Sequence, residues 1–295
     1  MTSGDGSSKQ ERKRRRIFSS LRHSLESAGM PVAGAKTLIC PICWKEVEYR
    51  QLELEHIIPR ALKGRRETLT CSECNRSAGA DLDHHVVGHH KFQEVMQGHG
   101  SMPWQLDVNG HRLAVQMSRD VLKPGINFKV IERATSQDAI ASSKAEFEQR
   151  KVQRIPAKFR FGFNERKRQI GMLKMAYLAT FHRFGYRLIE RPGMQFVRKL
   201  IVSRGEGAPD LTGIMGEMEL PDFLSAKQML FMDAQFVGVN FVWVILKCRI
   251  ETTVSRFVML PIEDVGEQIF AQLAHHAEDN PQFTVDNLRA EQFIV

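Results

Sequence analysis

The spacing of apolar and polar residues varies along the chain, and it predicts where strands and helices lie. Leucine and glutamate alternate over residues 52–55, which is typical of a half-buried strand, and Pro59 ends that strand because it lacks an N–H donor. Lys63-Gly64 then predicts a turn, and residues 68–70 predict a short second strand. Residues 74–79 read as one or two turns of helix. The pattern predicts a small strand–strand–helix unit near the N-terminus.

A second set of patterns begins at Ser101. It predicts a hairpin over 104–117 around Asn109-Gly110, then a strand over 126–132 and a polar helix over 136–152. A further helix follows, which Asn164 caps and Gly185 ends. The last predicted elements are strands over 236–249 and 254–260 and a helix over 263–276. The Met and aromatic stripe of the 164–185 helix is expected in the core. The expected fold class is α+β, with the small unit followed by a larger α+β accessory domain over 98–295.

Two segments lack a regular pattern. Residues 1–36 are rich in glycine and serine around a basic tract, so we expect a basic tail without fixed structure. It could bind phosphates, serve as a localisation signal or simply be solvated. In residues 81–90, Gly88 weakens a helix. We therefore expect a polar loop there, although a helix would bring His85 and His89 onto one face as a further metal site.

Composition narrows the class of protein. Hydrophobic residues make up 42% of the chain and charged residues 26%, as in ordinary globular proteins. The longest nearly apolar run, residues 236–246, is too short for a membrane-spanning helix, which needs about 20 residues. No apolar segment follows the basic start, as a secretory signal would require. We expect a soluble intracellular protein, located in the cytoplasm, without a membrane partner.

Charge is distributed unevenly along the chain. Residues 202–295 contain 6 basic and 14 acidic residues, although the whole chain has a net charge of +8. The basic part is expected to attract a polyanion such as nucleic acid, and the acidic part suits protein contacts or packing. Within the basic half, residues 144–191 hold 13 basic and 4 acidic residues. A nucleic-acid face and an amphipathic strand with solvated cations both remain open there.

The five cysteines add candidate chemistry. Cys40, Cys43, Cys71 and Cys74 form two C-x-x-C pairs, which suit the four soft ligands of a tetrahedral zinc ion. Because four thiolates close the coordination sphere, this ion would be structural. Redox pairs or buried thiols are the alternatives. Cys248 lies in an apolar run and is expected in the core.

The residues around the cysteines resemble the HNH endonuclease family. The resemblance covers roughly residues 38–90 and is carried by Glu55-His56-Ile57-Ile58-Pro59, Lys63-Gly64, Leu69-Thr70-Cys71-Ser72-Glu73-Cys74-Asn75, Gly79 and Asp83. It is closest to the subgroup in which four cysteines hold the ββα-metal core. The resemblance implies a treble-clef HNH nuclease domain with structural zinc over residues 37–97.

The resemblance also implies site residues. His56 matches the general base, and Glu55 and Asn75 match the ligands of a catalytic divalent cation, Mg²⁺ or Mn²⁺, with Asp83 as a further candidate ligand. Independently of the family, imidazole suits a base near neutral pH, and oxygen atoms suit hard cations. Neighbours on a regular strand face opposite sides, so Glu55 and His56 share a site only if the backbone bends. Otherwise Glu53 is the rival ligand.

The sequence departs from the family at one position. The middle asparagine, which orients the base, is absent from residues 65–68. Glu67, Thr68 or a backbone carbonyl could orient His56 instead. Asn75 stands where the last histidine of the family lies.

The expected function is a metal-dependent HNH endonuclease that hydrolyses DNA phosphodiester bonds. Basic residues around the site are expected to contact the nucleic acid; these are Arg60, Lys63, Arg65, Arg66 and Arg76. Two alternatives stay open. One is a non-catalytic zinc module that binds nucleic acid, and the other is an adaptor whose acidic C-terminal part recruits a protein partner. Specificity, DNA or RNA preference and oligomeric state are not predicted.

Overall fold

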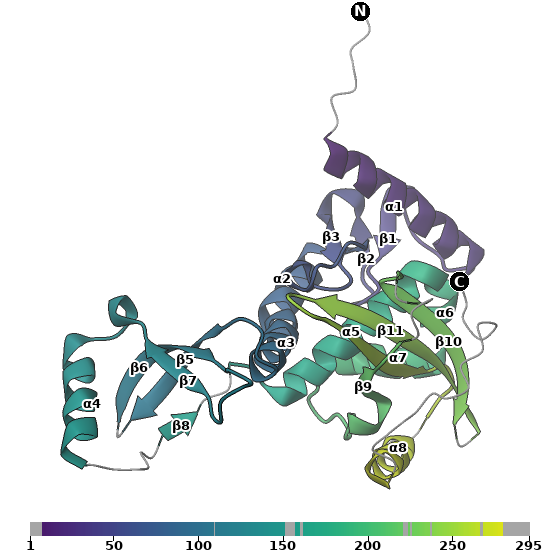
Figure 1. The fold of residues 1–295 in the computed structure, drawn as a ribbon. Helices are drawn as coiled ribbons and strands as arrows, with labels where there is room; N and C mark the ends of the chain where they lie inside the picture. Colours follow the sequence, from purple (N-terminus) through teal and green to yellow (C-terminus); the bar gives the residue numbers. More distant parts are fainter. Residues whose placement is uncertain are drawn as a thin grey trace, which may run out of the picture. The chain divides into compact units, whose positions relative to one another are not determined.

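The protein has an α+β fold, as the sequence predicts. The computed structural model describes residues 8–108, 110–150, 157–159, 162–220, 224, 226–236, 238–265 and 268–279. The chain divides into two compact units, Met1–Val86 with Glu165–Arg249 and Thr253–Val295, and Val87–Asn164 with Ile250–Thr252 (Figure 1). The expected accessory domain over 98–295 is therefore divided, because the chain rejoins the first unit at Glu165.

The first unit opens with helix α1 (Lys9–Ser27), within the segment that was expected to lack structure. The Ser8 hydroxyl accepts a hydrogen bond from the first turn, and Leu21 and Leu25 are buried four residues apart. A capped run of good helix formers with one apolar stripe outweighs the glycine- and serine-rich composition around it. The predicted disordered tail is wrong over this helix; residues 1–7 lie outside the described part.

The cysteine-bearing segment follows α1 and consists of two hairpins and a helix. Its elements are β1 (Thr37–Ile39), β2 (Glu46–Glu48), the 3-10 turn η1 (Tyr49–Gln51), β3 (Leu52–His56), the 3-10 turn η2 (Arg60–Leu62), β4 (Glu67–Cys71) and α2 (Ser72–Ala78). β1 pairs with β2 and β3 with β4, both antiparallel. The β3–β4 register runs without a break from Leu52↔Cys71 to His56↔Glu67. This confirms the predicted strand–strand–helix unit.

A π-helical turn, η3 (Gly79–Asp83), leads into helix α3 (His84–Met96), where a polar loop was expected. Leu82 and Val86 are buried four residues apart, and this packing outweighs the cost of about 1 kcal/mol for Gly88 within a helix. Close approach makes the packing possible, because a Cβ atom at Gly171 would lie 2.6 Å from a methyl carbon of Val86.

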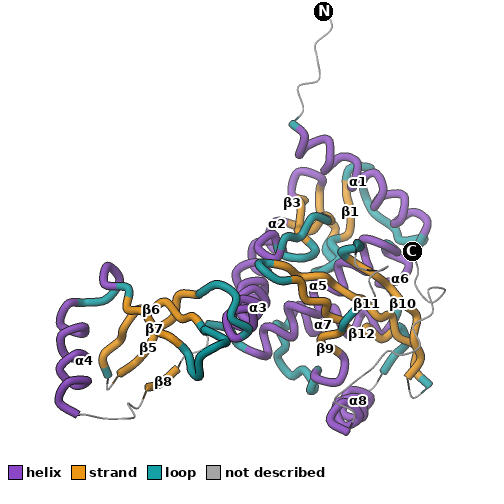
Figure 2. The backbone as a smooth tube through the Cα atoms, in the orientation of Figure 1, coloured by secondary structure: helices purple, strands orange, loops and turns teal. Residues whose placement is uncertain are grey.

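Helix α5 (Glu165–Phe184) forms the centre of the first unit (Figure 2). Its residues 169–181 are all buried, so the helix is surrounded on every side. The predicted helix over 164–185, with its Met-rich core stripe, is confirmed. Two shorter helices follow, α6 (Tyr186–Ile189) and α7 (Pro192–Val202).

A four-stranded antiparallel sheet completes the first unit, in the order β10-β11-β12-β9. Its strands are β9 (Met215–Met218), β10 (Met229–Phe236), β11 (Val239–Arg249) and β12 (Thr253–Pro261), with the 3-10 turn η5 (Thr212–Ile214) before and helix α8 (Gln268–Asp279) after. The two predicted strands and the last helix are confirmed, whereas β9 and β10 were not predicted. Cys248 is buried, as expected.

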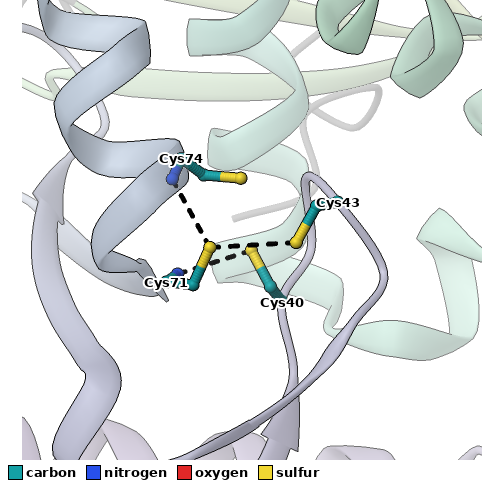
Figure 3. A group of neighbouring side chains, drawn as sticks. All are labelled: Cys40, Cys43, Cys71 and Cys74. Atoms are coloured by element: carbon teal, nitrogen blue, oxygen red, sulfur yellow. Dashed lines mark hydrogen bonds between the residues drawn. The ribbon is translucent and has the colours of Figure 1, made fainter.

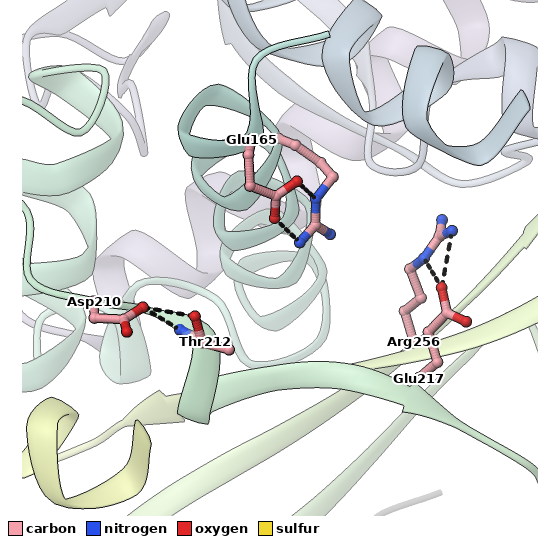
Figure 4. A network of polar contacts seen from close by, with 6 residues as sticks. Glu165, Asp210, Thr212, Glu217 and Arg256 are labelled. Carbon is pink, nitrogen blue, oxygen red and sulfur yellow. Dashed lines mark hydrogen bonds and ion pairs between the residues drawn. The ribbon is translucent and has the colours of Figure 1, made fainter. Parts of the chain in front are cut away.

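Polar contacts occur between β12 and the edge strand β9 of this sheet, and in the segment before β9 (Figure 4). Arg256 on β12 is buried, and its guanidinium lies 3.3 Å from Glu217 on the paired strand β9. Near β9, the Asp210 carboxylate accepts hydrogen bonds from the backbone and hydroxyl of Thr212. These bonds lower the pKa of Asp210.

The second unit is a four-stranded antiparallel sheet in the order β7-β6-β5-β8, with one long helix. Its elements are β5 (Met102–Val108), β6 (His111–Ser118), β7 (Asn127–Val130), the 3-10 turn η4 (Glu132–Ala134), α4 (Gln137–Arg150) and β8 (Ala157–Phe159). Gly110 has a φ of 87° in the predicted hairpin turn. The predicted hairpin, strand and polar helix are confirmed. The basic stretch over 144–191 includes residues 151–156, 160 and 161, which lie outside the described residues.

Across the helices of the described ranges, none combines the length and apolar character that crossing a bilayer would require.

Candidate metal centre and active site

Four cysteine thiols converge between the two hairpins (Figure 3). The sulfur atoms of Cys40, Cys43, Cys71 and Cys74 all lie within 4.8 Å of one another. The Cys43 and Cys71 sulfurs are 3.8 Å apart. A tetrahedral zinc ion with Zn–S bonds of about 2.3 Å needs sulfurs about 3.8 Å apart. The cluster suits one zinc ion, and it is the one such group of His, Cys, Asp or Glu side chains among the described residues.

Backbone hydrogen bonds shape the cysteine cluster. Cys71 is the N-cap of α2, and its sulfur accepts a hydrogen bond from the Cys74 N–H at 3.4 Å. The Cys71 N–H in turn points to the Cys40 sulfur at 3.4 Å. The neighbouring Cys40 thiol lowers the pKa of Cys71 to about 6, although burial opposes this shift. A thiolate, the form that binds metal, is thereby favoured at Cys71.

Two tyrosines from distant helices hold the first cysteine loop. The Tyr177 hydroxyl on α5 donates a hydrogen bond of 2.8 Å to the carbonyl of Pro41, and the Tyr186 hydroxyl on α6 donates to the carbonyl of Ile39. Burial raises the pKa of both phenols, so they remain protonated donors. The cysteine cluster is thus attached to the centre of the first unit.

His56 ends strand β3 and faces Glu67 across the hairpin. Its Nε2 atom lies 3.1 Å from a carboxylate oxygen of Glu67, and 32% of the His56 side chain is exposed. The other Glu67 oxygen forms an ion pair with Lys13 of α1. A neutral imidazole that donates Nε2–H to Glu67 presents Nδ1 as a proton acceptor. The geometry therefore suits a general base oriented by a carboxylate.

Glu55 has a different environment. It is 3% exposed, and its carboxylate lies 2.5 Å from the ammonium of Lys174, which is fully buried in α5. Lys174 also donates a hydrogen bond of 2.8 Å to Asp83. Desolvation lowers the pKa of Lys174, but the charges of Asp83 and Glu55 outweigh it and raise that pKa overall. Desolvation also raises the pKa of Glu55 against the attraction of Lys174. The raised pKa of Lys174 keeps its ammonium protonated between the two carboxyl groups.

Asn75 contacts Glu53, not Glu55. The Asn75 amide donates a hydrogen bond of 3.0 Å to a Glu53 carboxylate oxygen. Both residues line a cavity of about 440 Å³ that Glu11 and Arg14 of α1 also border. A carboxylate and an amide oxygen are hard donors, so this pair fits a divalent cation such as Mg²⁺ or Mn²⁺.

The three residues that the family resemblance places around one cation have three different partners here. The unbroken β3–β4 register directs the neighbouring side chains of Glu55 and His56 to opposite faces of the hairpin. Among the described contacts, Glu55 meets Lys174, His56 meets Glu67 and Asn75 meets Glu53. The structure thus separates a buried cluster around Lys174 from the half-buried His56–Glu67 pair and from the Asn75–Glu53 pair beside a cavity.

Comparison with known proteins supports one family. Residues 40–91 match a family described as HNH endonuclease. This segment of the chain is HNH-like. No curated protein and no solved structure is significantly similar to the chain. Residues 40–91, named the HNH segment, contain the cysteine cluster, the β3–β4 hairpin, Asn75 and Asp83, whereas the contacting residues of α1, α5 and α6 lie outside it.

The basic residues predicted to contact nucleic acid are exposed on the HNH segment: Arg60, Lys63, Arg65, Arg66 and Arg76. Lys63 has a φ of 58°, in the left-handed region, where it ends η2. Arg65 and Arg66 line a second cavity of the first unit, described further below. Their exposure keeps their charges available to a polyanion.

Sequence reasoning missed Lys174 altogether. It lies within a helix that reads as core, and nothing in its local pattern connects it with Asp83, 91 residues earlier. For the group that orients His56, the sequence leaves three candidates open, and Glu67 is one of them. The Lys63-Gly64 turn alone would not have decided this, because a hairpin centred on that turn would pair His56 with Cys71, whereas the register pairs His56 with Glu67.

Proposed function

We propose that the chain is a metal-dependent nuclease that hydrolyses phosphodiester bonds of DNA. The observation that carries the proposal is the half-buried His56–Glu67 pair at the end of β3, within the segment that matches HNH endonucleases. Phosphodiester hydrolysis needs a base for the attacking water, and basic residues that hold the polyanion. The HNH segment offers both on its surface.

His56 would act as the general base. Its Nδ1 atom accepts a proton from water, while Glu67 holds the ring through Nε2 and stabilises the imidazolium that forms. Lys13 forms an ion pair with the other oxygen of the Glu67 carboxylate and helps to hold it in place. This assigns to Glu67 the orienting role that the missing asparagine has in the family.

Glu53 and Asn75 would hold the divalent cation, because their oxygens line an open cavity. Such a cation supplies charge neutralisation for the phosphate and the leaving oxygen. Glu55 and Asp83, which the sequence suggested for this task, would instead stay with Lys174. The cysteines would bind zinc and hold the scaffold.

The test is cleavage of supercoiled plasmid DNA in Mg²⁺ or Mn²⁺. We expect His56→Ala to reduce the rate by roughly 10²–10⁴-fold, as loss of a general base does. The exposed His23 of α1 offers a matched control, because His23→Ala removes an imidazole from the same unit without touching the site. Circular dichroism and zinc content should match among all three proteins. Equal cleavage by His56→Ala and the parent protein would refute the mechanism.

One observation favours a second candidate, a zinc module that binds nucleic acid without cutting it. Two of the predicted metal ligands, Glu55 and Asp83, are already neutralised by Lys174. In that case the parent protein would retain labelled DNA in a binding assay and leave plasmid intact in every divalent cation tried. Cleavage that requires His56 decides against this candidate.

A further inference from the structure

A basic cavity lies beside the HNH segment within the first unit. It has a volume of about 560 Å³ and is bordered by three parts of the chain: the loop before β4, the end of α5, and residues 226–231 at the start of β10. Of its residues, the proposed function uses only Arg65 and Arg66, as general contacts to the polyanion. Its walls come from segments far apart in the sequence, so it exists only in the folded unit.

The wall between the loop and β10 is fixed by one glutamine. The Gln228 side chain accepts a hydrogen bond of 3.0 Å from the Arg65 N–H and donates one of 2.9 Å to the carbonyl of Lys63. The loop is also tight at Gly64, where a Cβ atom would lie 1.7 Å from the carbonyl oxygen of Ile58. The cavity is therefore bordered by backbone that is held in place.

The charged side chains that line the cavity are all cationic. Cationic side chains reach it from all three parts of the chain, and its described lining contains no carboxylate; the cations are Arg65, Arg66, Arg183 and Lys227, with His182 beside them. All five are exposed to solvent. Desolvation and the charges of Arg66 and Lys13 lower the pKa of His182, which indicates how closely these cations gather.

Apart from Gln228, the remaining lining is apolar and consists of Ala226, Met229, Leu230 and Phe231. A ligand that suits this cavity therefore combines negative charge with an apolar surface. A nucleotide has this character, since its phosphate is anionic and its sugar and base have apolar faces. Inorganic anions would use the charges but not the apolar lining.

The cavity is also close to the proposed chemistry along the chain. Arg66 directly precedes Glu67, the residue that contacts His56, and the Arg66 carbonyl accepts a hydrogen bond of 3.1 Å from the Ile57 N–H next to His56. Two backbone segments thus connect the cavity wall with the histidine pair. A strand held in the cavity would be held by the same hairpin that carries His56.

We propose that this cavity binds the sugar–phosphate backbone of the DNA strand and positions it for cleavage. The proposal rests on the proposed function for its choice of ligand. Arg65, Arg66 and Lys227 contact the phosphates, and Gln228 maintains the wall. These are positioning residues, since they do not touch the water or the scissile bond.

The experiment measures binding of a fluorescent 20-base-pair duplex in EDTA, where no cleavage occurs, by anisotropy over a range of salt concentrations. The triple variant Arg65→Ala/Arg66→Ala/Lys227→Ala should bind at least about 10-fold more weakly, and the slope of log K against log salt should fall by about 2–3. A matched control removes three exposed cations elsewhere in the unit, Arg187→Ala/Arg191→Ala/Lys199→Ala. This control should change the affinity by less than about 3-fold.

Further arms separate the outcomes. Equal losses in both triple variants would show general attraction to a basic protein and overturn the proposal. Titration with dAMP separates a free nucleotide from a DNA strand. If the cavity variant loses dAMP binding but keeps its DNA affinity, the cavity belongs to a free nucleotide and the proposal is overturned.

Two more variants keep this result apart from the nuclease proposal. His56→Ala should bind the duplex like the parent protein and fail to cut it. If His56→Ala still cuts while the cavity variant loses binding, the mechanism fails and the cavity assignment stands. Gln228→Ala retains every cation of the cavity. Weaker binding of the duplex by this variant would support a role for the wall that Gln228 holds, and unchanged binding would show that the wall has no such role.

Discussion

Lys174 places a full positive charge inside the first unit, at the position where two predicted metal ligands meet. Burying an ammonium ion costs several kcal/mol, and this cost is offset only when opposite charges lie in contact. Glu55 and Asp83 provide that contact at 2.5 and 2.8 Å. The side chain does in the folded protein what a bound cation would otherwise do for these two carboxylates.

We predict that Lys174→Met lowers the free energy of unfolding by about 3–5 kcal/mol, because it leaves two buried carboxylates uncompensated. Urea unfolding measures this change, with Lys199→Met at an exposed position of α7 as the control. In the smaller variant Lys174→Ala, Mn²⁺ should raise the melting temperature by several degrees by replacing the ammonium. If Mn²⁺ raises the melting temperature of the parent protein by as much, the assignment of Lys174 as the counter-charge of the two carboxylates is contradicted.

At the residue scale, sequence reasoning recovers the side chains of the hairpin but not their partners. His56, Glu55 and Asn75 stand out because each belongs to a short motif whose spacing is visible in the chain. Glu55 pairs with Lys174 of α5, and Glu67, the partner of His56, pairs with Lys13 of α1; both helices lie far away in the sequence. A long-range ion pair has no local pattern, so Lys174 reads as part of an apolar helix.

At the scale of elements, the zinc cluster and the hairpin were predictable because paired cysteines and alternating residues are local signals. The helices α1 and α3 were not, because composition and one glycine pointed to irregular structure. Burial of apolar side chains explains both helices. Leu21 and Leu25 are buried on α1, and Leu82 and Val86 are buried where α3 begins. Tertiary packing overrides weak local preference in this way.

Zinc removal tests the cluster that joins these elements. We predict one zinc ion per chain by atomic emission, and loss of the hairpins when a strong chelator removes it, since zinc binding contributes about 10–16 kcal/mol in small zinc domains. Cys71→Ser should have the same effect on far- and near-ultraviolet circular dichroism. Cys248→Ser, at a buried thiol outside the cluster, is the control and should keep its zinc. Full zinc content in Cys71→Ser would exclude the assigned ligand set.

At the scale of the whole molecule, the HNH segment is only part of a larger core. Helix α5 contacts both β4 and the 79–83 turn, and the tyrosines of α5 and α6 hold the first cysteine loop. The sequence suggested a separate domain over 37–97, because motif spacing shows where a family segment lies but not which core supports it. The structure groups this segment with residues from 165 onward.

We therefore predict that residues 37–97, expressed alone with zinc, do not form a stable fold. Without α5, Glu55 loses its counter-charge and the carbonyl of Pro41 loses the hydrogen bond from Tyr177. The amide resonances of this fragment in a two-dimensional NMR spectrum should be poorly dispersed, in contrast to those of the full chain. A well-dispersed spectrum from the fragment would show that the segment is autonomous.

The ammonium of Lys174 also has a consequence for the newly made chain. Asp83 leaves the ribosome 91 residues ahead of Lys174, a delay of roughly 5–20 seconds at typical translation speeds of about 5–20 residues per second. During that interval the hairpin has its cysteines but not the charge that compensates its acids. A cell that makes this protein would therefore hold an incompletely folded chain until the later helix emerges.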